Sequence, residues 1–288
     1  MTDKYKKLLG VISAVALLAP LISFAANSFQ VDTDTTLMTG LRAYYQLEEA
    51  SGDRVEFNGT STYNLAPTNT PGNAAGKVVS GGAANALDLE RTSTQNLSTS
   101  SDLGITGGAI SMAGWVQVED APGTDTYYVP FAQGDTTNNV SYFIYYADES
   151  GTKRLIFART KANVAQQSVN YDTTLTPGTW YHIALTYDSI NIRGYVSSTS
   201  VVTPTAATST GTGGGDSNLA FKIGDRTLSG GGTRWDGLID EVGVWNKALT
   251  QTEINDLYNA NSGQTMVASV PAAAPARCRI QGVGRCHQ

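Results

Sequence analysis

The sequence predicts an all-β chain that folds as an antiparallel sandwich or barrel, with one short helix near its C-terminal end. Short segments that alternate apolar and polar residues, separated by turn residues, extend from about residue 39 to residue 258. The 288 residues include 30 Gly, and 14 Tyr outnumber 7 Phe. Charged residues make up 15%, against about 25% in an ordinary domain. This composition favours turns and strands over a helical bundle or a coiled coil.

The first 25 residues are expected to be a secretory signal peptide. Three Lys stand among the first seven residues, an apolar run follows as far as Phe24, and Ser23-Phe24-Ala25 has the small-x-small pattern of a cleavage site. The alternative is an uncleaved anchor helix, because the apolar run is nearly long enough to span a bilayer. No second run of that length follows. The mature chain is therefore expected to be secreted or at the cell surface, with no membrane span.

Five strands are predicted from the alternation. They cover residues 110–118, 142–146, 153–158, 180–187 and 191–196. In the first, Ile110, Met112, Val116 and Val118 share one face, and Trp115 lies on the other. Turn residues at 150–151 and at 188–189 are expected to close two hairpins. The pattern indicates an antiparallel arrangement of consecutive strands.

One helix is predicted to begin after Thr250, a plausible N-cap with Glu253 three residues later and an apolar stripe at Ile254, Leu257 and Tyr258. Thr- and Gly-rich segments at 208–217 and 229–233 are expected to be loops, and an Ala- and Pro-rich composition begins after Gly263. The expected organisation is a signal peptide at 1–25, a linker at 26–38, one domain at 39–262, and a flexible tail at 263–288 that carries Cys278 and Cys286.

The net charge and the small numbers of Cys and His argue against several classes of function. The net charge of -6 and the pI near 4.9 argue against a nucleic-acid partner, which needs a basic surface to offset phosphate charge. Both Cys lie in the last eleven residues, so the domain is expected to lack a disulfide and a thiolate metal site. With His182 as the single His of the domain, a zinc site and a Ser/His/Asp triad both lack their minimum parts.

Three stretches, in this order, resemble the laminin G-like (LamG-like, concanavalin A-like) family of jelly-roll domains. They are residues 41–54, residues 110–116 with 179–187, and residues 235–250, which read Trp-Asp-Gly-Leu-Ile-Asp-Glu-Val before the predicted helix. The last stretch is the most specific, because a glycine turn, this strand and a capped helix rarely occur together by chance. The resemblance covers about residues 39–261. It implies two packed antiparallel sheets with the first and last strands as neighbours.

The resemblance also implies a structural Ca²⁺ site in many members, which links the Asp of the last strand to an acidic turn after the first strand. The candidate ligands here are Glu48, Glu49, Asp53, Glu56 and Asp240. Carboxylate oxygens are the hard ligands that Ca²⁺ takes. The alternative is that Asp240 and Glu241 pair with Arg42, Arg54 or backbone amides and hold the edges of the sheet together.

Sugar binding needs aromatic platforms with polar groups at their edges. The candidates, expected to be exposed, are Tyr127, Tyr128, Tyr142, Tyr146 and Trp235. The alternative is that strand tyrosines simply cover a pleated surface.

The sequence thus predicts a secreted, non-catalytic recognition module that binds a glycan or an extracellular protein. A structural or adhesive component of a cell-surface layer, an appendage or a virion is the alternative. A glycan-cleaving enzyme is disfavoured, because retaining hydrolysis needs two carboxylates about 5–5.5 Å apart. No predicted strand carries two acids at two-residue spacing.

Overall fold

The computed structural model describes residues 29–31, 36–80, 83–105, 108–124, 126–133, 141–161, 164–197, 205–210, 219–226 and 233–266. The predicted signal peptide, most of the linker, most of the two Thr- and Gly-rich loops, and the tail from residue 267 with both Cys lie outside the described residues. Within the described part, no helix is long and apolar enough to cross a membrane.

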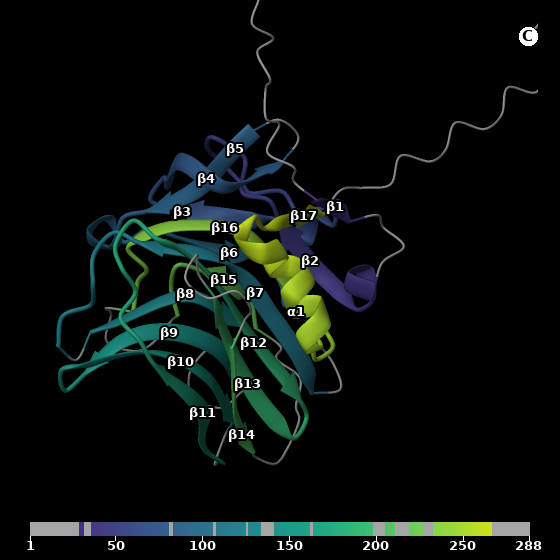
Figure 1. Cartoon of the computed structure of the whole chain (residues 1–288). Helices are drawn as coiled ribbons and strands as arrows, with labels where there is room; N and C mark the ends of the chain where they lie inside the picture. Colours follow the sequence, from purple (N-terminus) through teal and green to yellow (C-terminus); the bar gives the residue numbers. More distant parts are fainter. Residues whose placement is uncertain are drawn as a thin grey trace, which may run out of the picture.

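Two antiparallel sheets form a sandwich (Figure 1). One sheet contains, in spatial order, β11 (Val164–Asp172), β10 (Thr152–Lys161), β9 (Ser141–Glu149), β8 (Tyr127–Gln133), β15 (Phe221–Ile223), β6 (Asn96–Thr99) and β3 (Leu65–Thr68). The other contains β14 (Thr205–Thr210), β13 (Asn191–Ser197), β12 (Trp180–Asp188), β7 (Ala109–Val118), β16 (Gly237–Trp245), β5 (Ala83–Leu89) and β4 (Gly72–Ser80), and β2 (Leu41–Tyr45) pairs with β16. The predicted sandwich is confirmed, with the first and last of its strands as neighbours.

The remaining elements are short. The chain forms the helix α1 (Gln251–Tyr258), a parallel pair of β1 (Phe29–Val31) with β17 (Gln264–Met266), and four single-turn 3₁₀ helices at Thr36–Met38, Ser61–Tyr63, Arg91–Ser93 and Asn259–Asn261. The predicted capping box is present: Glu253 N donates to Thr250 Oγ1, and Thr250 N donates to Glu253 Oε2. The hairpin between β9 and β10 turns at Ser150 and Gly151, both with positive φ.

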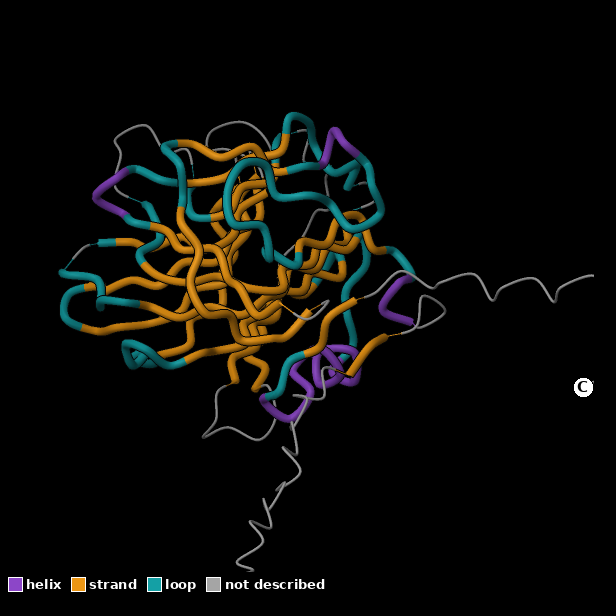
Figure 2. The backbone as a smooth tube through the Cα atoms, turned by 90° about the horizontal axis from the view of Figure 1, so that it is seen from above, coloured by secondary structure: helices purple, strands orange, loops and turns teal. Residues whose placement is uncertain are grey.

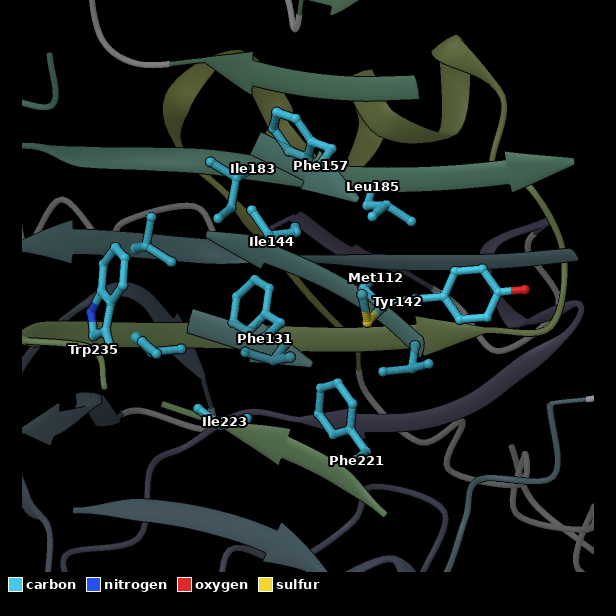
Figure 3. Packing of buried hydrophobic residues seen from close by; sticks show 14 of the residues in the cluster. Met112, Phe131, Tyr142, Ile144, Phe157, Ile183, Leu185, Phe221, Ile223 and Trp235 are labelled. Carbon is cyan, nitrogen blue, oxygen red and sulfur yellow. The ribbon is translucent and has the colours of Figure 1, made fainter. Parts of the chain in front are cut away.

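The main core lies between the two sheets and is built from large side chains of both (Figure 3). Met112, Ile183 and Leu185 come from the eight-stranded sheet, and Phe131 and Phe157 from the seven-stranded sheet. A Cβ at Gly114 would lie 2.8 Å from Phe131 Cζ, so glycine is needed there for the sheets to approach each other. This packing explains the alternation seen in the sequence, because one face of each strand points inward.

The outer faces of the two sheets differ. Helix α1 lies across the eight-stranded sheet (Figures 1 and 2), where Ile254 and Leu257 pack with Trp245. On the seven-stranded sheet, Val129, Phe143 and other residues form a separate apolar cluster, against which Tyr127 and Tyr145 pack while partly exposed. Among the described residues, no α-helix covers this second face.

Candidate functional site

Four of the five aromatic residues predicted to stack on a sugar are core residues. Tyr142, Tyr146 and Trp235 are fully buried, and Tyr128 is 3% exposed. Figure 3 shows Tyr142 and Trp235 within the cluster between the sheets. The expectation that these four side chains are exposed is therefore wrong. A residue with no accessible ring face cannot stack on a ligand from solution.

The alternation of side chains explains this correction. Tyr142 and Tyr146 are four residues apart on β9, so they share one face of the strand. That face points inward: Tyr146 lies opposite Tyr128, and the Tyr142 ring lies 5.8 Å from that of Tyr187 on the other sheet. The outward face of the same strand carries Phe143 and Tyr145.

The fifth candidate, Tyr127, lines a pocket of about 220 Å³ on the outer face of the seven-stranded sheet. Its described lining residues are Tyr127, Val129, Tyr145, Glu149, Gln166, Arg226 and Thr233, and we call it the Tyr127–Tyr145 pocket. Sequence reasoning missed all of these except Tyr127. The signal that could have found Tyr145 was the run of aromatic residues from 142 to 146, which places aromatic rings on both faces of one strand.

Aromatic rings form one wall of the pocket. The Tyr127 and Tyr145 rings meet edge to face at 5.5 Å, and Tyr145 stacks on Phe143 at 5.7 Å. The Arg226 guanidinium carbon lies 3.4 Å from the centre of the Phe143 ring. Gln166 Nε2 donates to Tyr145 Oη at 3.5 Å. Burial raises the pKa of Tyr145, so its phenol stays neutral and keeps its hydroxyl proton.

Polar side chains lie at the edge of the pocket, and hydrogen bonds hold the segment opposite the aromatic rings in place. Glu149 Oε2 accepts from Arg154 Nη1 at 3.1 Å, and the Glu149 side chain is 34% exposed. The Thr233 backbone carbonyl accepts from Val129 N at 3.0 Å, and Thr233 Oγ1 lies 2.7 Å from the Arg226 carbonyl. These contacts hold the chain around residues 226 and 233 against the edge of β8. The pocket therefore combines aromatic surface with a carboxylate, an amide and a guanidinium.

The five predicted metal ligands do not come together. Glu49 Oε1 accepts from Val55 N at 2.7 Å, and Asp53 is exposed near Arg54. Glu56 is buried in its own turn, where Oε2 accepts from Thr60 N at 3.1 Å. None of these three carboxylates gathers with Asp240 among the described residues, and local hydrogen bonds within the loop after β2 hold Glu49 and Glu56.

Asp240 and Glu241 are buried side by side on β16, at a bulge where Glu241 has a φ of 52°. Asp240 Oδ2 accepts from the backbone amides of Lys77 and Val78, at 2.8 and 3.0 Å. Glu241 Oε2 accepts from the Tyr44 hydroxyl. Burial raises the pKa of Asp240 to about 8 and the pKa of Glu241 well above its ordinary value, with added repulsion from Glu48.

The alternative partners for this pair are confirmed in part: backbone amides donate to Asp240, whereas Glu241 accepts from a tyrosine, and neither arginine donates to the pair. Arg42 donates to the Leu103 and Gly104 carbonyls, and Arg54 donates to the Gly52 carbonyl. Within the described residues, Asp240 Oδ1 has no hydrogen-bond partner, whereas the Glu241 carboxyl also interacts with the Thr265 side chain. Such an orphaned hard oxygen has the chemistry that a Ca²⁺ ion takes.

A closer gathering of carboxylates lies elsewhere. In the described part of the chain, ligand oxygens of Asp88, Glu90 and Glu119 lie within 4.8 Å of one another. Burial raises the pKa of Asp88 and of Glu119; repulsion from Asp236 adds to the rise at Asp88, and repulsion from Asp88 and Glu90 adds to it at Glu119. Exposed acidic groups of this kind are common without an ion.

Comparisons with known proteins agree with the fold. Residues 91–255 match the sequence model of the concanavalin A-like lectin/glucanases superfamily. No curated protein sequence matches the chain. Among solved structures, domain 4 of AbnA, an extracellular GH43 arabinanase from Geobacillus stearothermophilus in complex with arabinotriose, has a TM-score of 0.53 at 20% identity and covers 75% of this chain and 97% of that one.

Two further similar structures belong to larger proteins. The enzymatically active domain of tailspike protein 2 from bacteriophage CBA120 has a TM-score of 0.52 at 16% identity, and the match covers 70% of this chain and 30% of that one. Botulinum neurotoxin type C, whose cell entry depends on two ganglioside molecules, has a TM-score of 0.50 at 13% identity, over 77% of this chain and 51% of that one. At these identities the likeness concerns the fold.

Proposed function

The chain belongs to the concanavalin A-like lectin/glucanases superfamily, and from this premise we propose that it is a recognition module that binds a glycan in the Tyr127–Tyr145 pocket. One observation carries the proposal: two partly exposed tyrosines and three different polar groups converge on a hollow in the outer face of the seven-stranded sheet. Sugar rings present C–H faces that pack on aromatic rings, and hydroxyls that need directed hydrogen bonds. The pocket offers both kinds of contact.

The size and groups of the pocket define the ligand further. Its volume of about 220 Å³ lies below the range of about 300–1,000 Å³ for drug-sized ligands, which favours one sugar unit at a time. Glu149 and Gln166 supply acceptors for sugar hydroxyls, and Arg226, which lies over the Phe143 ring, supplies a cation. The unit bound would be a chain end or a side branch.

We propose that binding occurs without cleavage. Glu149 is the one carboxylate among the described residues that line the pocket, and it is paired with Arg154. Retaining and inverting glycosidases both use two carboxyl groups that flank the bond to be cleaved. The signal-peptide pattern at residues 1–25 supports a place of action outside the cell, where the partner would be a glycan of a surface or matrix.

Calorimetric titration with arabinotriose and with a ganglioside oligosaccharide tests this function, followed by a wider glycan set. Tyr127→Ala and Tyr145→Ala are each expected to weaken binding about 10-fold or more, because an aromatic contact contributes about 1–3 kcal/mol. Tyr63→Ala is the matched control, since Tyr63 is also partly exposed but lies away from the pocket. Release of reducing sugar is expected to stay at background.

Two results would contradict the proposal. Binding that Tyr127→Ala and Tyr145→Ala leave unchanged would move the site elsewhere on the domain. An absence of binding across the glycan set, with the fold intact by circular dichroism, would reject glycan recognition and favour the adhesive or structural role.

A structural Ca²⁺ bound at the buried Asp240 is a second proposal. The buried Asp240 Oδ1, which has no hydrogen-bond partner among the described residues, supports it. Thermal unfolding with Ca²⁺ and with a chelator is the test: the ion is expected to raise Tm in the wild type and in Asp53→Asn, whose side chain is exposed, but not in Asp240→Asn. An equal Tm with Ca²⁺ and with chelator in the wild type would reject the ion.

A further inference from the structure

Arg159 is a buried cation inside the sandwich. It lies on β10 and is 2% exposed. Its guanidinium carbon is 4.7 Å from the ring of Tyr187 on the eight-stranded sheet and 5.9 Å from the ring of Tyr142 on β9. The guanidinium therefore lies over one aromatic ring from each sheet. The N–H donors lie along the edges of the guanidinium and need hydrogen-bond acceptors there.

Polar residues surround Arg159 in register. Tyr142 lies opposite Gln133 on one side and opposite Arg159 on the other, and Gln167 follows on β11. Residues directly opposite each other share a face of the sheet, so this row lies at one end of the core. Figure 3 shows the Tyr142 hydroxyl directed away from Met112 and Phe131, toward that end. The row forms a polar layer at the end of an otherwise apolar core.

Several donors in this layer have no partner. Within the described residues, no acceptor is found for Arg159 Nε or Nη2, or for the Tyr187 hydroxyl. Nε and Nη2 lie on the same edge of the planar guanidinium, and they form the fork that matches two oxygens of a carboxylate. Arginine stays charged under all conditions in which proteins fold. A buried charge needs a counter-charge or strong hydrogen bonds.

The described residues around Arg159 supply no such counter-charge. Asp188 is the carboxylate next to Tyr187 on β12, and its oxygens accept from Ile190 N, Asn191 N and the Arg193 guanidinium at 2.6–3.0 Å. The Asp188 carboxylate is therefore bonded within the β12–β13 hairpin and does not pair with Arg159. Gln133 and Gln167 are neutral.

We propose that the Nε–Nη2 edge of Arg159, with the Tyr187 hydroxyl, binds a small carboxylate-type oxyanion inside the end of the sandwich. The anion would accept two parallel hydrogen bonds from the guanidinium and a third from Tyr187. It would neutralise the one buried charge of the polar layer. This site is separate from the Tyr127–Tyr145 pocket, whose described lining residues include neither Arg159 nor Tyr187.

Thermal unfolding in matched sodium salts tests the proposal. Formate is expected to raise Tm by about 2–4 °C over chloride at equal ionic strength, the shift that a modest ligand gives a domain of this size. Arg159→Met and Arg159→Lys should lose the difference, because both lack the fork. Tyr187→Phe should reduce it. Arg193→Met is the control and should keep it, since Arg193 is 31% exposed and bonded to Asp188.

Glucuronate distinguishes the two sources of a carboxylate. A response to formate alone would identify a free small anion, whereas a response to glucuronate of equal size would identify the acid group of a sugar. Equal Tm in formate, glucuronate and chloride would overturn the proposal. Water would then be the acceptor for the N–H groups of Arg159 and the hydroxyl of Tyr187. A formate response retained in Arg159→Lys, or in Arg159→Met and Tyr187→Phe together, would overturn it as well.

Discussion

The outer faces of the two sheets differ in what covers them, and this difference separates structural from accessible polar groups. On the eight-stranded sheet, Trp115, His182 and Asp240 are at most 2% exposed. On the seven-stranded sheet, Tyr127, Tyr145 and Glu149 remain partly exposed. Both faces carry aromatic rings and ionisable groups on strands of the same sandwich. The three groups named on the covered face cannot meet a ligand, whereas the three on the open face can.

Segments before and after the sandwich strands help α1 to cover the outer face of the eight-stranded sheet. Trp245 Nε1 donates to the Leu37 carbonyl at 2.7 Å, and β17 pairs with β1 beyond the helix. Under this cover the Tyr258 ring stacks on Trp115 at 5.7 Å, and the Trp115 ring meets His182 at 5.3 Å. The covered face therefore behaves as a second core, and mutations in it should act on stability.

Trp115→Ala should have the largest effect, because Trp115 is buried between His182 and Tyr258. Loss of a buried aromatic side chain costs about 3–5 kcal/mol. Urea unfolding measures it as a lower midpoint at unchanged slope. Tyr127→Ala on the open face is the matched variant and should cost less than about 1 kcal/mol. Equal losses in the two variants would remove the distinction between the faces.

His182 makes the covered face sensitive to acid. Burial lowers its pKa to about 3, against 6.5 in the unfolded chain. Between these values the unfolded state binds a proton that the folded state does not. The contribution to stability is therefore complete above pH 6.5 and is lost as the pH falls toward 3.

His182→Leu isolates this contribution. Relative to the variant, the wild type is expected to lose about 2 kcal/mol between pH 6.5 and 4.5, because the slope rises from half of about 1.36 kcal/mol per pH unit at pH 6.5 to its full value below it. Denaturant unfolding of both proteins at several pH values gives the difference. A difference that stays constant with pH would mean that protonated His182 is accommodated, and hence that the face is open to solvent.

Thr250→Ala should destabilise α1, the helix that covers the outer face of the eight-stranded sheet. Thr250 Oγ1 accepts from Glu253 N in the capping box of α1, so its loss should cost about 1 kcal/mol. Urea unfolding gives the size of the effect, and hydrogen exchange should show faster exchange in α1 than in β9. Thr250→Ser keeps the acceptor and should behave as wild type. If Thr250→Ala exchanged no faster in α1, the helix would be held by packing alone.

The fold could be predicted because strand alternation is a local property. The predicted strand at 110–118 is β7 within one residue, and the capped helix begins at Gln251 as expected. The site could not be predicted in the same way. Adjacent residues such as Tyr127 and Tyr128 point to opposite faces, and the sequence does not say which face is outside when both carry aromatic rings.

Long-range contacts explain the remaining misses. Arg226 enters the Tyr127–Tyr145 pocket from a segment about 80 residues after Phe143, through a contact that no spacing rule reveals. The acidic turn after β2 looked like one ligand set in the sequence. Glu49 and Glu56 instead accept local hydrogen bonds within the turn, whereas Glu48 accepts from Asn85 N and repels Asp240.

Glu149→Gln should have the smallest effect on stability, and it tests directly whether charged groups on the open face are less tightly held than those on the covered face. Its salt bridge with Arg154 is partly exposed on both sides, and such pairs contribute about 0.2–1 kcal/mol. The loss should shrink further in high salt, because exposed charges are screened. Urea unfolding at low and high ionic strength measures both quantities. Trp115→Ala, which removes no charge, is the salt-insensitive reference. A loss of several kcal/mol that salt does not reduce would mean that the open face holds its charges as tightly as the covered one, and that Glu149 is not available to a ligand.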